Sequence, residues 1–132
     1  MNVLEGRIAK MNTYGPLTLV RVKVEDYLLS AIVTDTPETA SYLRMNHPVK
    51  LIFKETEVII GIGQQGKISL RNQFKGKISK IKKGALQCKL SIATDVGQIN
   101  SIITVNAVEE LGLEKGKEVL ALVKTNEMML SE

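Results

Sequence analysis

Three polar residues just past the middle of the chain, Ser69, Arg71 and Asn72, place a hydroxyl, a guanidinium and a carboxamide within four residues. They follow a Gly- and Gln-rich stretch at residues 61–66 and precede an alternating pattern typical of a β-strand. The planar guanidinium of Arg71 carries five N–H donors and suits an oxyanion held by two-point contact. By itself, a surface arginine beside a linker is the plainer interpretation, so an anion site here needs support from other segments.

Two further points in the second half place donor groups at the boundaries of expected elements. Thr104 ends an expected strand, and a short helix is expected to begin near Asn106 and Ala107, where backbone N–H groups and the helix dipole favour an anion. Lys124 and Thr125 supply a cation and a hydroxyl at the end of another strand. A tetrahedral dianion of the MO4 type needs several N–H and O–H donors and some positive charge, without a metal. These segments form one site only if the fold brings them together.

The composition is that of a globular chain with an excess of positive charge. Of the 132 residues, 44% are hydrophobic and 24% are charged, and the formal net charge is +4. This charge favours anionic partners, but the absence of Trp, with two Phe and three Tyr, leaves little material for stacking nucleic-acid bases. Because no apolar run reaches the length of a membrane span and no signal peptide is visible, we expect a cytoplasmic protein.

Catalysis and metal binding are not expected from the residue inventory. The chain has one cysteine, Cys88, and one histidine, His47, and it shows no cluster of carboxylates. A single cysteine excludes an internal disulfide and a cysteine-based zinc site. We therefore expect no catalytic residues and no metal ligands, and hence no enzyme.

The two halves of the sequence repeat one pattern at an offset of 70 residues. The matched pairs include Asn2 and Asn72, Gly6 and Gly76, Ile8 and Ile78, Lys10 and Lys80, Thr34 and Thr104, and Lys54 and Lys124. Each half predicts strands and a short helix in the order β-β-β-α-β-β, which is the content of a small Greek-key barrel of the OB type. We therefore expect an all-β fold with short helices, built as two tandem OB-like five-stranded barrels.

The expected boundaries follow from this repeat. The first barrel is assigned to residues 1–63, the linker to 64–68 and the second barrel to 69–132. Expected strands span residues 4–11, 17–24, 28–34, 49–54 and 57–62, then 73–81, 86–93, 98–104, 118–124 and 128–130. A short helix is expected after Thr36 and Pro37, and another from Asn106 to before Gly112. Because one such unit buries little core, the two should pack together and oligomerise.

Several other positions are expected to have structural roles. Asn2 and Asn72 are suited to pinning backbone at the start of a strand rather than to touching a ligand. Gly6 and Gly76 are expected at bends of the barrel strands. Cys88 is expected to be a small buried hydrophobic residue.

The motifs of the second half resemble the molybdenum-binding Mop or TOBE domain. They are Ser69-x-Arg71-Asn72-Gln73-Phe74-Lys75-Gly76-Lys77-Ile78, Ile103-Thr104 ahead of Glu110-Leu111-Gly112-Leu113-Glu114-Lys115-Gly116-Lys117-Glu118-Val119, and Leu122-Val123-Lys124. They cover the second half in the order and spacing of the family, and the first half resembles a more divergent copy. The whole chain is similar to a di-Mop protein.

The resemblance implies an OB-like barrel that forms homo-oligomers and binds molybdate or tungstate at subunit interfaces, with no other cofactor. By the family pattern, Ser69 and Arg71 would hydrogen-bond the oxyanion, and Lys124, beside Thr125, would supply charge. Thr104 and the backbone N–H near Ala107 would contribute from a neighbouring copy.

The sequence departs from the family pattern at several positions. Leu70 stands where many members have a small residue, and Ala107 stands where a hydroxyl is common. The first repeat begins Met1-Asn2 and has no Ser-x-Arg before its asparagine. It keeps Thr34 and Lys54, which would form a weaker site at most, so we expect fewer sites than repeats.

Three functions remain open at this point. The first is a cytoplasmic protein that binds molybdate or tungstate for storage, buffering or sensing. The second is a nucleic-acid-binding OB protein, although the basic run Lys80-Ile81-Lys82-Lys83 is more typical of a solvated strand end. The third is an accessory ligand-sensing domain of a molybdate-responsive regulator or transporter.

Overall fold

The structure of the protein is a computed structural model that describes residues 1–63 and 67–132. The elements of the first half are β1 (Asn2–Tyr14), β2 (Leu17–Val24), β3 (Tyr27–Val33), β4 (Pro48–Phe53), the 3-10 helix η1 (Glu55–Glu57) and β5 (Ile59–Gly61). Those of the second half are β6 (Asn72–Lys83), β7 (Gln87–Thr94), β8 (Gly97–Thr104), α1 (Val105–Glu110), β9 (Glu118–Val123), the 3-10 helix η2 (Thr125–Glu127) and β10 (Met129–Ser131). The described residues contain no helix long and apolar enough to span a membrane.

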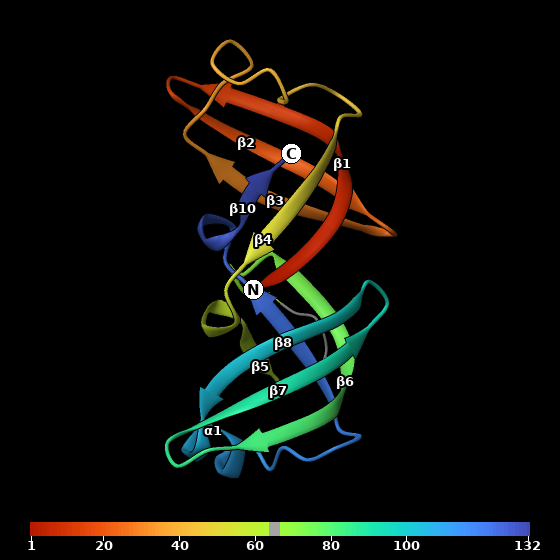
Figure 1. The fold of residues 1–132 in the computed structure, drawn as a ribbon, viewed down its shortest axis with the longest axis vertical. Coiled ribbons are helices and arrows are strands. Elements are labelled where there is room, and N and C mark those ends of the chain that lie inside the picture. The colour runs from red at the N-terminus through yellow and green to blue at the C-terminus, as the bar shows by residue number, and fades with distance from the viewer. Residues whose placement is uncertain (64–66) are drawn as a thin grey trace.

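The strands form two curled five-stranded antiparallel sheets that lie one beyond the other along the long axis of the molecule (Figure 1). Sheet A has the strand order β10-β4-β1-β2-β3, and sheet B has the order β5-β9-β6-β7-β8. Two β1 residues on either side of a register shift, Ile8 and Lys10, have counterparts at a register shift in β6, Ile78 and Lys80. The predicted all-β fold of two OB-like five-stranded units is therefore confirmed.

Each sheet receives one edge strand from the other repeat. β10 pairs with β4 of the first repeat, with Met129 opposite Ile52, and β5 pairs with β9 of the second, with Ile59 opposite Leu122. Figure 1 shows β10, in blue, among the red-to-yellow strands of sheet A. The sequence placed each final strand in its own repeat, and the structure corrects that placement. Because an unpaired edge exposes backbone N–H and C=O groups, the exchange protects one edge of each sheet.

The linker assignment lies partly outside the described residues, since residues 64–66 are not described. The division into residues 1–63 and 69–132 remains a prediction about units of sequence. In the folded chain, sheet A contains β10 from the second range and sheet B contains β5 from the first.

Of the two short helices that the sequence predicted, the one in the second repeat forms and the one in the first repeat does not. α1 begins at Val105, with Thr104 as its N-cap, and a left-handed residue, Gly112 at φ +60°, follows its end. The prediction of a helix after Thr36 is wrong, because residues 36–43 form turns instead. There the hydroxyl of Thr39 accepts a hydrogen bond from the Thr36 N–H at 2.8 Å, and such local side-chain bonds compete with helix formation.

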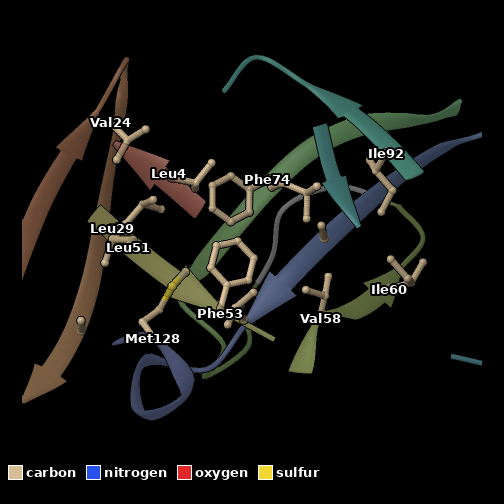
Figure 2. Close-up of a cluster of buried hydrophobic side chains, with 14 of the residues drawn as sticks. Leu4, Val24, Leu29, Leu51, Phe53, Val58, Ile60, Phe74, Ile92 and Met128 are labelled. Atoms are coloured by element: carbon tan, nitrogen blue, oxygen red, sulfur yellow. The ribbon is translucent and has the colours of Figure 1, made fainter. Parts of the chain in front are cut away.

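Buried hydrophobic side chains from both sheets form one continuous cluster. At its centre, Phe53 of β4 stacks on Phe74 of β6, with ring centroids 6.4 Å apart and ring planes 7° from parallel. Figure 2 shows the two rings between side chains of sheet A, such as Leu51, and side chains of the other sheet, such as Ile92. The two sheets therefore share one continuous core.

Two glycines allow strands to cross closely at the bends. A Cβ atom at Gly76 would lie 2.5 Å from the carbonyl oxygen of Ala93, and one at Gly6 would collide with the carbonyl oxygen of Lys23. Both glycines are therefore required by close backbone approach. Cys88, as predicted, is buried in the core.

Candidate oxyanion-binding site

Arg71 and Lys124 lie beside each other at the ends of two paired strands. In the antiparallel register of β6 and β9, Asn72 is opposite Val123, so the next residues outward are Arg71 and Lys124. Both side chains are exposed. Lys124 is also the N-cap residue of η2, which places the half-buried Thr125 directly beside it.

Ser69 is exposed and lies two residues before Arg71 in the same segment. We refer to Ser69, Arg71, Lys124 and Thr125 as the second-repeat corner. It combines two hydroxyls with two cations. The ion pairs within residues 1–63 and 67–132 both involve Glu55, so neither cation of the corner is neutralised by an ion pair in this part of the chain.

Local hydrogen bonds hold the segment that carries Arg71. Arg71 Nη1 donates to the Ile68 carbonyl oxygen at 3.1 Å, and Gln73 Nε2 donates to the Leu70 carbonyl oxygen at 2.7 Å. Between them, the buried Asn72 side chain bonds the backbone of Ser30 in sheet A. The first bond uses one of the five guanidinium N–H donors. The segment is thus fixed to both sheets, while Arg71 keeps donors for a ligand.

Thr104 and Ala107 lie away from the second-repeat corner within one chain. Thr104 pairs with Gln87 at the start of β7, and the neighbouring residue Cys88 pairs with Lys83 at the far end of β6. β6 therefore separates the corner, near Asn72, from the end where α1 lies (Figure 1). A single copy does not bring all six predicted residues together.

The N–H of Ala107 already has a partner in this structure. It donates to Thr104 Oγ1 at 3.1 Å, which forms the N-cap of α1. Within the single chain this N–H is therefore already hydrogen-bonded, and a contribution from it to a site between copies stays a prediction. Thr104 itself is exposed at the strand end.

The first repeat builds a corner with the same backbone but different side chains. Asn2 is opposite Phe53, so Met1 and Lys54 lie side by side as Arg71 and Lys124 do. Lys54 is exposed and is the N-cap residue of η1. Thr34, the other residue predicted for a weaker first-repeat site, is exposed just beyond the end of β3.

Glu55 is the main residue that the sequence analysis missed. Its Oε1 accepts a hydrogen bond from the Met1 amino nitrogen at 3.0 Å, and its Oε2 lies 3.0 Å from Lys89 Nζ. These two bonds, that of the Met1 ammonium first and that of Lys89 second, lower the pKa of the Glu55 carboxyl. The available signal was the offset of 70, which aligns Glu55 with Thr125.

Metal coordination by protein side chains finds no support in the described ranges. Residues 1–63 and 67–132 contain no group of three His, Cys, Asp or Glu side chains placed to hold a metal ion. Arginine, lysine and hydroxyl groups are donors, and donors of this kind suit the oxygen atoms of an anion.

The fold and this donor set define a two-repeat, OB-like β protein with a cationic corner at the strand ends. The TOBE domain family matches residues 68–130. Over 64 residues, the chain is 42% identical to molybdenum-pterin-binding protein 2 and 41% identical to molybdenum-pterin-binding protein 1, both of Clostridium pasteurianum; each match covers 48% of this chain and 94% of the relative. The chain therefore belongs to the TOBE, or Mop, family of molybdenum-pterin-binding proteins.

The similarity to a solved structure extends over both repeats. The cytoplasmic molybdate-binding protein ModG, solved with molybdate bound, superimposes with a TM-score of 0.89 and 25% sequence identity. The superposition covers 98% of this chain and 94% of that one. The predicted resemblance of the whole chain to a di-Mop protein is thus confirmed, and the residues of the site remain predictions.

Proposed function

We propose that the protein binds molybdate, or the similar dianion tungstate, at the second-repeat corner and serves in the cytoplasm as a store, buffer or sensor of it. The observation that carries the proposal is the register of β6 and β9, which sets Arg71 beside Lys124. The names of the relatives support the ligand, since they are molybdenum-pterin-binding proteins and a molybdate-binding protein.

The chemistry of the corner suits a tetrahedral dianion. The Arg71 fork can donate two parallel N–H bonds to two oxygen atoms, while Lys124 acts as a point charge near a third. Hydroxyls of Ser69 and Thr125 can donate to the remaining oxygen. Since neither bond making nor a cofactor is needed, the role proposed is reversible binding rather than catalysis.

We infer that a second copy of the chain completes the site with Thr104 and the backbone near Ala107. In one copy these groups lie at the far end of β6 from the corner, so any contribution from them requires a neighbour. Thr104 is exposed, which leaves it accessible to such a neighbour. The protein is therefore proposed to be a homo-oligomer with the ligand at subunit interfaces.

Isothermal titration with molybdate, tungstate, sulfate and chloride tests the proposal. We expect saturable heat with molybdate and tungstate and none with chloride. Because a hydrogen bond to a charged group contributes about 1.5–3 kcal/mol, Arg71→Ala should weaken binding by about 10- to 100-fold. Lys124→Ala should also weaken it, whereas Lys115→Ala, which removes an exposed lysine outside the corner, should not.

The proposal fails on a clear result. If the wild-type protein gives no heat with molybdate or tungstate, the corner is not an oxyanion site. If wild-type protein binds molybdate but Arg71→Ala and Lys115→Ala bind equally well, the site lies elsewhere in the chain.

A further inference from the structure

The two 3-10 helices place equivalent residues beside equivalent lysines. The backbone of Lys54 has φ −74° and ψ 146°, and that of Lys124 has φ −68° and ψ 140°. In each turn the N–H three residues later donates to the lysine carbonyl oxygen, at 3.0 Å in η1 and 2.9 Å in η2. The residues directly after the lysines, Glu55 and Thr125, therefore occupy matching positions.

The surroundings of the two turns differ in charge. η1 packs against β8 of sheet B, and η2 packs against β3 of sheet A. The first turn thereby meets Lys89, whose ammonium bonds Glu55. The residue at the position of Lys89 in the other repeat is Leu19, which carries no charge. We refer to Lys54, Glu55 and Lys89 as the first-repeat corner.

The first-repeat corner already contains an anion. The Glu55 carboxylate has both oxygen atoms bonded to nitrogen atoms at 3.0 Å, and its side chain is 20% exposed. A carboxylate presents two oxygen atoms and a negative charge, as one edge of a tetrahedral oxyanion does. In the second-repeat corner the matching residue, Thr125, is a hydroxyl donor without charge.

We propose that Glu55 is a built-in anion that closes the first-repeat corner to oxyanions, in addition to the lack of a Ser-x-Arg segment there. This inference rests on the proposed function of the second-repeat corner. The carboxylate neutralises Lys89 and repels an incoming dianion, and both effects weaken oxyanion binding at the first-repeat corner. Replacing it with threonine gives the first corner the donor present in the second.

The variant Glu55→Thr tests this inference in the full chain. We expect titration with molybdate to show one more bound molybdate per chain than in the wild-type protein. The matched control is Glu57→Thr, which removes the same charge from the same 3-10 helix at a position where both repeats have glutamate. It should leave the stoichiometry unchanged.

Two double variants identify where the additional molybdate binds. Glu55→Thr combined with Arg71→Ala should keep the gained site while the second-repeat corner is weakened. Glu55→Thr combined with Lys89→Leu, which installs the residue type of Leu19, should lose at least part of the gain. Glu55→Gln, which keeps the size of the side chain, replaces Glu55→Thr if the threonine variant does not fold by circular dichroism, and it should also gain a site.

The outcomes separate this inference from the proposed function. If the wild-type protein binds molybdate and neither Glu55→Thr nor Glu55→Gln gains a site, Glu55 is only a structural ion-pair partner and the inference is wrong. If the control Glu57→Thr gains as much, the effect is one of net charge and the inference is also wrong. If the wild-type protein binds no molybdate, the proposed function fails and this inference fails with it.

Discussion

The side chain of Asn72 binds the backbone of Ser30 in the other sheet through two hydrogen bonds. Its Nδ2 donates to the Ser30 carbonyl oxygen at 2.9 Å, and its Oδ1 accepts from the Ser30 N–H at 2.8 Å. The repeat builds the same pair again, since Asn2 binds the backbone N–H and carbonyl of Asn100 at 2.8 and 2.9 Å. Each asparagine thus continues the backbone pairing of a strand across the boundary between the sheets.

Replacing Asn72 with alanine should destabilise the protein. The change leaves the buried N–H and carbonyl of Ser30 without these partners, and each unsatisfied buried group costs about 1–3 kcal/mol. We expect a loss of about 2–4 kcal/mol in the free energy of unfolding, measured by urea denaturation. Asn126→Ala, at an exposed position, is the control. Equal stability of the two variants would show that the Asn72 bonds contribute nothing net.

Replacing Phe74 with alanine should weaken both sheets together. Phe74 is fully buried, stacks on Phe53 and contacts the ring of Tyr27 at a centroid distance of 5.3 Å. Truncating a buried Phe costs about 3–5 kcal/mol. Calorimetry should show one transition at a lower temperature. Tyr14→Ala, at a side chain that is 90% exposed, should change little. Two separate transitions in the variant would contradict a shared core.

Much of the fold was predictable because the residues that recur in the two repeats are of types that determine local structure. Gly6 and Gly76 marked the bends, and Asn2 and Asn72 marked the strand starts. The exchange of β5 and β10 was not predictable, since both acceptor strands, β4 and β9, offer a hydrophobic edge to either one. The pattern of hydrophobic residues in a strand indicates what kind of strand it can pair with. It does not decide between two similar strands.

The candidate site was predictable only in part. The motifs placed Arg71 and Lys124 at strand ends, and the register of β6 and β9 then brought them together. The role of Glu55 depends on Lys89, which comes from the other repeat and meets it only because the turn η1 packs on sheet B. A contact between residues 34 positions apart leaves no local pattern in the sequence.

The ion pairs of Glu55 should make stability depend on pH in the acidic range. The bonds from the Met1 ammonium and Lys89 hold the folded-state pKa of Glu55 below its ordinary value of 4.5. The unfolded chain therefore binds this proton more readily as the pH falls. The contribution of the Glu55 ion pairs to the stability of the fold is fully present above pH 4.5. It is lost as the pH falls through the lower, folded-state pKa.

Glu55→Gln isolates this contribution. Because the ion pairs are partly solvated, the free energy of unfolding of this variant should differ from that of the wild-type protein by less than about 1 kcal/mol at neutral pH. The difference should be smaller in strong acid. Urea denaturation at both pH values measures it. A difference that grows as the pH falls would contradict the direction of the pKa shift.

Mixed oligomers should show whether Arg71 and Thr104 act from different copies. Arg71→Ala and Thr104→Val should each weaken molybdate binding when expressed alone. If each site takes Arg71 from one copy and Thr104 from a neighbour, co-expression in equal amounts should restore about one quarter of the sites, because that fraction combines an intact Arg71 with an intact Thr104. The measurement is the number of tightly bound molybdate ions per chain, averaged over all oligomers of the co-expressed protein. The two variants mixed only after purification, without subunit exchange, are the control and should show no such sites. If co-expression restores none, both residues serve the same copy or Thr104 acts only as the cap of α1, and the interface site is wrong.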